Sequence, residues 1–167
     1  MIKISFLAIS MFLVTPAFAD LQVRFDEGAP KDRFSFLNIG ECDIGSTTLS
    51  IDLSGSPYGL IFDVTGTGAG VEVFQPFEVV DGSENLRAMP LVQDGDNQIS
   101  LELLGLKPGE TLAFTIDVDD TKNNREITVS NSEFTGTRIV AKTEQETSDA
   151  FFEETTIAEI TLQGCRS

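Results

Sequence analysis

Apolar and polar residues alternate with a period of two along most of this chain. The runs Leu21 to Phe25, Leu49 to Leu53 and Leu112 to Ile116 place an apolar side chain at every second position. Successive side chains of a strand point to opposite faces of a sheet, so these runs predict strands with one buried face. Shorter runs of the same kind cover 34–36, 71–73, 99–103 and 127–129.

Clusters of Gly, Pro, Asp and Ser separate these runs and favour turns. About nine or ten short strands with regular turn spacing predict an all-β fold, an antiparallel immunoglobulin-like β-sandwich. In the run Leu112 to Ile116, we expect Phe114 and Ile116 to face the core and Thr115 and Asp117 to lie on the other face. No change of composition divides residues 20–167, which we expect to form a single domain.

One segment departs from the alternation. Thr143 to Thr156 carries five acidic residues around Ala150, Phe151 and Phe152. It predicts an acidic excursion or a single helical turn, after which the chain returns to a strand from Ile157 to Leu162.

The first nineteen residues have the pattern of a secretory signal peptide. One positive charge at Lys3 precedes the apolar run Ile4 to Val14, and Ala17 and Ala19 supply small residues before a cleavage point at Asp20. An uncleaved anchor is the alternative, but the run is shorter than the ~20 residues that a spanning helix needs. The pattern predicts a periplasmic or extracellular protein, with no integral membrane segment once residues 1–19 are removed.

Export changes how the two cysteines are interpreted, since an oxidising compartment allows thiols to pair. We expect a disulfide between Cys42 and Cys165, the only two cysteines of the chain. Two free thiols and an intermolecular bridge are the alternatives.

Charge and composition exclude several functions. Asp and Glu number 27 against 11 Lys and Arg, which gives a formal net charge of -16. Nucleic-acid and anionic membrane surfaces are therefore poor partners, because both require clustered basic residues. The chain has no His, so it cannot build a Ser-His-Asp triad or a His-ligated zinc site. We expect no enzymatic activity, although catalysis by carboxylates alone stays open.

The glycines from Gly66 to Gly70 superficially match a dinucleotide-binding loop. Such a loop requires a helix behind the glycines, whereas the alternating residues Val71 to Phe74 that follow predict a strand. We interpret the segment as a structural loop, with positive φ angles or packed closely against a neighbouring strand.

The segment from Asp117 to Asn124 is rich in side-chain oxygens at alternate positions, the spacing with which a loop wraps calcium. Lys122 and Thr128 stand where a helix-loop-helix calcium loop requires Gly and Glu, so that specific loop is excluded. A calcium site at the end of a sandwich stays open, and its alternative is an acidic hairpin tip with Lys122 and Arg125 as ion-pair partners. The candidate ligands are Asp117, Asp119, Asp120, Thr121 and Asn123, with Asp94 and Asp96 as further candidates.

Three stretches, residues 23–34, 51–80 and 114–130, resemble a family of short exported proteins and domains from marine bacteria described as aggregation-factor core-like. The label comes from sponge cell-adhesion proteoglycans. The resemblance implies a secreted adhesion or matrix-associated β module and carries over no catalytic or ligand residues.

Together these patterns favour an exported cell-surface or matrix-associated adhesion or interaction module, assisted by calcium. Its partner is expected to be a cell-surface or matrix component, or a second copy of the chain. A carboxylate-dependent extracellular hydrolase and a ligand-free periplasmic accessory domain are the alternatives.

A first prediction concerns covalent structure. We expect the exported protein to begin at Asp20 and to contain the bridge between Cys42 and Cys165. Mass measurement after alkylation of the denatured, unreduced protein should show no labelled thiol, and two labels would contradict the bridge. The Cys165→Ser variant should lose about 2–5 kcal/mol of unfolding free energy.

Overall fold

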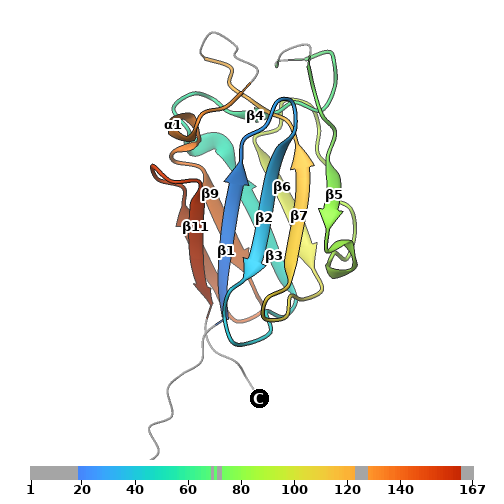
Figure 1. Cartoon of the computed structure of the whole chain (residues 1–167), viewed down its shortest axis with the longest axis vertical. Coiled ribbons are helices and arrows are strands. Elements are labelled where there is room, and N and C mark those ends of the chain that lie inside the picture. Colours follow the sequence, from blue (N-terminus) through green and yellow to red (C-terminus); the bar gives the residue numbers. More distant parts are fainter. Residues whose placement is uncertain (1–18, 69, 71–72, 123–127, 163–167) are drawn as a thin grey trace, which may run out of the picture.

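Two antiparallel sheets face each other in the structure (Figure 1), a computed structural model that describes residues 19–68, 70, 73–122 and 128–162. The predicted all-β fold with antiparallel sheets, consistent with a β-sandwich, is confirmed. The immunoglobulin-like connectivity stays a prediction. Residues 1–18 of the predicted signal peptide lie outside the described residues.

The first sheet has five strands in the order β11-β1-β2-β7-β5. They are β11 (Ile157–Leu162), β1 (Ala19–Asp26), β2 (Asp32–Asn38), β7 (Thr111–Ile116) and β5 (Glu78–Asp81). The predicted return to a strand from Ile157 to Leu162 is confirmed, and this strand pairs with β1.

The second sheet has four strands in the order β10-β9-β3-β6. They are β10 (Thr147–Phe151), β9 (Arg138–Lys142), β3 (Thr47–Asp52) and β6 (Gln98–Leu103).

Strand β10 corrects the sequence interpretation of Thr143 to Thr156, which is neither an excursion nor a helical turn. Thr143 N donates to Glu146 O at 2.9 Å, which closes a tight turn and returns the chain alongside β9. An ion pair between Arg138 Nε and Asp149 Oδ2 at 3.0 Å adds a cross-strand contact. Pairing with β9 therefore outweighs the local acidic composition.

Short elements complete the described fold. Strands β4 (Ile61–Phe62) and β8 (Val118–Asp119) form a two-stranded ribbon, and Figure 1 shows β4 at the upper end of the sandwich. The others are the 3-10 turns η1 (Leu53–Gly55) and η2 (Ser83–Asn85) and the helix α1 (Asn131–Phe134).

The core lies between the two sheets and is rich in phenylalanine. Phe25, Phe34 and Phe114 of the first sheet are fully buried, as are Leu49 and Ile51 of β3. Phe34 and Phe114 stack with ring centroids 5.2 Å apart, so neighbouring strands interlock through their aromatic side chains. The predicted inward direction of Phe114 and Ile116 is confirmed.

The opposite face of β7 was expected to be exposed, but it is buried. Thr115 is 9% exposed and Asp117, just beyond the strand, is 1% exposed. The backbone of Gln75 passes beside this face and accepts a hydrogen bond from Asp117 N at 3.3 Å, so another segment of the chain replaces solvent there.

Two short predicted strands do not appear among the described residues. Val73 and Val129 lie outside every strand, although Val129 is buried. Thr128 is likewise outside every strand, and the remaining positions of those predictions, 71–72 and 127, lie outside the described residues.

Cys42 is 5% exposed, and no cysteine within the described part of the chain is free. Cys165 lies outside that part, so its pairing with Cys42 stays a prediction. Over the same described part of the chain, none of the helices has the length and apolarity to cross a bilayer.

The core predicts a large effect of truncating Phe114. The Phe114→Ala variant should lose about 3–5 kcal/mol of unfolding free energy, because a buried ring is replaced by a cavity. Denaturant unfolding measures this loss. The control is Phe151→Ala, whose ring is 53% exposed and which should lose far less. Equal losses in the two variants would contradict this assignment of the core.

Candidate functional site

The ribbon formed by β4 and β8 gathers three aspartates on one of its faces. Phe62 pairs with Val118 and Ile61 with Asp119, so the next pair of this register places Asp63 opposite Asp117. Asp63 N donates to Asp117 O at 3.1 Å. Side chains of directly opposed residues share a face, and residues two positions apart share it too. Asp63, Asp117 and Asp119 therefore lie together, and we call them the aspartate cluster.

Three segments of the chain lock this arrangement through their backbones. Asp63 N donates to Asp117 O, Asp117 N donates to Gln75 O at 3.3 Å, and Gln75 N donates to Asp63 O at 3.4 Å. This closed ring of hydrogen bonds fixes the Cα positions of Asp63 and Asp117.

The aspartate cluster is withdrawn from solvent. Asp63, Asp117 and Asp119 are each 1% exposed. No N–H or O–H group of the described residues has hydrogen-bond geometry to either carboxylate oxygen of Asp63 or of Asp117, although the Val118 N–H lies near enough to Asp117 to oppose the rise of its pKa. Buried polar groups are almost always hydrogen-bonded, because an unsatisfied one costs several kcal/mol and a charged one more. Four such oxygens at one place therefore require a further explanation.

Asp32 is equally buried, but its carboxylate is fully engaged. Its Oδ1 accepts from Gly28 N at 3.0 Å and its Oδ2 accepts from Val118 N at 2.9 Å. Since Val118 lies between two members of the aspartate cluster, Asp32 positions β8 relative to the first sheet.

Two glycines of the Gly66–Gly70 segment lie against carboxylates. A Cβ atom added to Gly70 would fall 2.5 Å from Asp119 Oδ2 and closer still to Asp63 Oδ2. Those two oxygens are therefore no more than twice that distance apart, with Gly70 beside both. A Cβ at Gly68 would likewise clash with the carboxylate of Asp94. The predicted close packing against a neighbouring strand is confirmed at Gly70, beside Asp119 of β8, whereas Gly68 lies against Asp94, outside the strands. Neither glycine has a positive φ angle.

The other predicted ligands differ in whether they lie near the aspartate cluster. Asp94 lies beside Asp63, and its Oδ1 accepts from Val64 N and Thr65 N, each at 3.1 Å. Asp120 is 2% exposed. Asp96 Oδ2 accepts from Gln93 N at 2.7 Å, and Thr121 Oγ1 donates to Gly59 O at 2.8 Å, so these two side chains have local structural roles. Asn123 lies outside the described residues.

The predicted acidic hairpin tip is therefore wrong as regards exposure. Asp117, Asp119 and Asp120 are all buried. Lys122, expected as an ion-pair partner, donates through Nζ to Pro57 O at 3.2 Å. Arg125 lies outside the described residues, so its predicted ion pair is not tested.

Burial and mutual repulsion change the acidity of these groups. Burial, followed by the nearby carboxylates of Asp119, Asp32 and Asp63, raises the pKa of Asp117 to about 8. Burial and the adjacent Asp94 and Asp119 raise the pKa of Asp63 to about 7. Burial also raises the pKa of Asp32 to about 7, against the hydrogen bonds from Gly28 and Val118.

Sequence reasoning missed Asp63, which completes the cluster. A signal for it exists in the segment Leu60 to Val64, where one aspartate interrupts an otherwise apolar run. In the segment Ile116 to Asp119, two aspartates likewise follow apolar residues. Two such segments that pair as antiparallel strands bring their acids together.

The aspartate side chains are close but do not yet converge. Among the described residues, no three His, Cys, Asp or Glu side chains are already arranged as the ligands of a metal ion. A cation at the cluster therefore requires the carboxylates to turn about their χ angles, which are the soft degrees of freedom of an aspartate.

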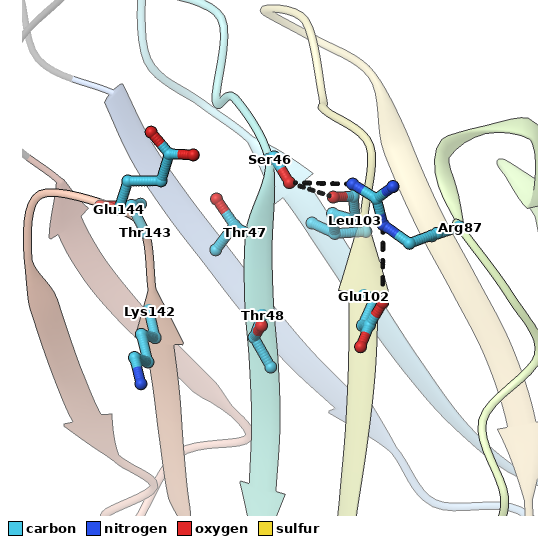
Figure 2. Close-up of a pocket in the computed structure, with 9 residues that line it drawn as sticks. All are labelled: Ser46, Thr47, Thr48, Arg87, Glu102, Leu103, Lys142, Thr143 and Glu144. Atoms are coloured by element: carbon cyan, nitrogen blue, oxygen red, sulfur yellow. Dashed lines mark hydrogen bonds and ion pairs between the residues drawn. The ribbon is translucent and has the colours of Figure 1, made fainter.

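A second candidate site is a groove on the other sheet. It has a volume of about 490 Å³ and lies over the Thr47 end of β3 (Figure 2). Figure 2 shows Lys142 and Glu144 on one side and Arg87 and Glu102 on the other, with Thr48 between them. The lining residues are Ser46, Thr47, Thr48, Arg87, Glu102, Leu103, Lys142, Thr143 and Glu144.

Comparison with known proteins gives no further assignment. No protein-family model matches the chain, and no curated protein matches it.

The raised pKa values predict an unusual dependence of stability on pH. The pKa of Asp117 is about 8 in the folded state and near 3.8 in the unfolded state. At pH values between these two, the folded protein binds more protons than the unfolded chain does. In the presence of a chelator, the unfolding free energy should therefore fall as the pH rises from about 4 to about 8. The Asp117→Asn variant should flatten this fall, and Asp26→Asn, at an exposed ion pair with Arg24, should not. Thermal melts across pH measure the slope, and a wild-type slope of opposite sign would refute the assignment.

Proposed function

We propose that the protein is an exported interaction module of the cell surface or extracellular matrix, which docks an acidic, hydroxyl-rich polymer on the outer face of its four-stranded sheet. The single observation that carries the proposal is the groove of Figure 2. The proposed partner is an acidic polysaccharide, whose hydroxyl groups match the Thr and Ser side chains of this face and whose acid groups can pair locally with Lys142.

The floor of the groove is a row of outward side chains on three paired strands. Thr48 pairs with Lys142 on one side and with Glu102 on the other, so these three side chains share a face. Farther along the same face, Ser50 Oγ and Ser100 Oγ are hydrogen-bonded at 2.9 Å. Short hydroxyl side chains thus line the centre of the sheet, with longer charged ones beside them.

Hydroxyl groups both donate and accept hydrogen bonds, as the hydroxyls of a sugar do. Thr48, Ser50 and Ser100 therefore match a polyhydroxylated chain lying along the sheet. Ser46 Oγ, at the rim, already accepts from Arg87 Nη2 at 3.4 Å and is oriented by it.

The groove is less acidic than the chain as a whole, because its two basic side chains, Arg87 and Lys142, balance its two acidic ones, Glu102 and Glu144. Arg87 is paired with Glu102 at 3.5 Å, whereas Lys142 forms no ion pair with a described residue. At physiological ionic strength the screening length is about 8 Å, so a bound acid group responds to Lys142 more than to the distant net charge.

The hydrolase alternative is less well supported. The carboxylates of the aspartate cluster are 1% exposed, so a polymer chain cannot reach them in this conformation. Adhesion through the open groove requires no such access.

Binding of a soluble polyuronate tests the proposal. Lys142→Ala should weaken binding about two- to fivefold, the range of an exposed charge pair, and added salt should weaken the wild type similarly. Lys107→Ala is the matched control, since Lys107 is a lysine of another surface with a 73% exposed side chain. Calorimetry with the polyuronate, and with a neutral polysaccharide of equal length, measures the effect.

No binding to either polymer, as expected of a ligand-free accessory domain, would refute the proposal. Equal weakening by Lys107→Ala would refute the groove as the docking site. Self-association that sizing detects in wild type and that Lys142→Ala abolishes would replace the polymer with a second copy of the chain.

A further inference from the structure

We infer that the aspartate cluster is a binding site for a divalent cation of the calcium class, with Asp63, Asp117 and Asp119 as ligands. The site differs from the predicted loop, because Asp63 comes from a separate segment, directly after β4, and Thr121 has another partner. The inference is independent of the polymer proposed for the outer face.

The contrast with Asp32 carries the inference. Asp32, Asp63 and Asp117 are each 1% exposed. The fold supplies two backbone donors to Asp32, one for each oxygen. No described donor has hydrogen-bond geometry to the four oxygens of Asp63 and Asp117, and the Val118 N–H near Asp117 donates to Asp32 instead. A buried carboxylate with a purely structural role is satisfied by the fold, so the two unsatisfied ones indicate a missing electropositive partner.

The described basic residues do not provide that partner. The five ion pairs among the described residues all lie at the surface, and none includes Asp63 or Asp117. Lys122, the nearest lysine in sequence, contacts the carbonyl of Pro57.

Gly70 shows that space beside the carboxylates is kept free of side chains. A methyl group there would contact oxygens of both Asp63 and Asp119. Glycine lets the backbone approach the two carboxylates without a side chain between them.

Oxygen ligands and deep burial favour calcium over magnesium. Calcium accepts six to eight oxygens in flexible geometry, which suits carboxylates that must still turn to converge. Magnesium demands near-octahedral geometry and keeps several waters, for which a site 1% exposed offers little room. Further ligands would come from backbone carbonyls and from neighbours such as Asp94.

The competing explanation is that protons alone neutralise the cluster. The two explanations differ in the response to calcium. If a cation binds, Asp63→Asn and Asp117→Asn should relieve repulsion in chelator and also remove the response to calcium. If only protons bind, calcium has no effect on any form of the protein.

Calorimetric titration of the full exported chain with calcium, after treatment with chelator, tests the site. Calcium should bind and should raise the melting temperature with the logarithm of its concentration above the dissociation constant. Asp63→Asn and Asp117→Asn should each weaken binding at least about tenfold. Magnesium at equal concentration should give a much smaller shift of the melting temperature.

A terbium titration supplies a readout that folding alone cannot mimic. Tyr58 is the only tyrosine, the chain has no Trp, and Tyr58 O accepts from Thr121 N at 3.3 Å, two residues beyond Asp119. Terbium luminescence sensitised by Tyr58 should rise on binding and fall when calcium competes. Tyr58→Phe should abolish the emission without changing calcium affinity.

Two matched pairs keep the test specific. Asp26→Asn, at an exposed ion pair, should bind calcium as wild type does. Gly70→Ala should lose binding with every acid still present, and Gly45→Ala, whose added methyl meets no atom within 4 Å, should keep it. The inference is overturned if wild type shows no response to calcium and terbium, or if the response survives Asp63→Asn and Asp117→Asn together.

Discussion

Burial of phenylalanine between the two sheets is the interaction on which the rest of this structure depends. Phe25, Phe34 and Phe114 occupy three adjacent strands, and Phe134 of α1 stacks on Phe25 with ring centroids 3.9 Å apart. Each fully buried ring contributes on the order of 1.5–3 kcal/mol by its removal from water. The helix thereby closes one end of the core that the strands leave open.

This core fixes the directions of the side chains from Thr115 to Asp119. Because Phe114, Ile116 and Val118 are held in the core, the intervening Asp117 and the next residue, Asp119, must lie on the opposite face. That face is covered by the segments of Asp63 and Gln75 rather than by water. The aspartate cluster is thus buried because of the strand alternation and because one additional segment covers that face. Burial of these carboxylates costs desolvation free energy, which a compensating positive charge can offset.

The periodicity of the sequence was sufficient to predict the strands that bury one face and the core position of Phe114. It failed where a contact distant in sequence decides the outcome. Thr147 to Phe151 becomes a strand because β9 offers it an edge, which no local pattern in that acidic segment indicates. The helix α1 had a local signal in Ser130 and Glu133, whose carboxylate accepts from Ser130 N at 2.7 Å, an N-terminal capping contact.

Prediction of the candidate site failed in a different way. Asp117 and Asp119 could be identified from their spacing, but spacing gives only ligands that are neighbours in sequence. Asp63 joins them through the register of β4 on β8, and that register is set by the hydrogen-bond ring with Gln75. A cluster assembled from separate segments can be predicted from a sequence only when both segments carry the same signal, an acidic residue within an apolar run.

The aspartate cluster and the groove lie at different ends of one framework. The groove lies at the Thr47 end of β3, whereas the Asp52 end leads through η1 to β4 and Asp63. A six-residue strand spans roughly 17–20 Å, about two screening lengths at physiological salt. Direct electrostatic influence of one site on the other is therefore weak, and any coupling must pass through the packing of β3 against the phenylalanine core. Since close-packed cores transmit strain but cost free energy to rearrange, a cation at the aspartate cluster would act on the groove chiefly by stabilising the common framework.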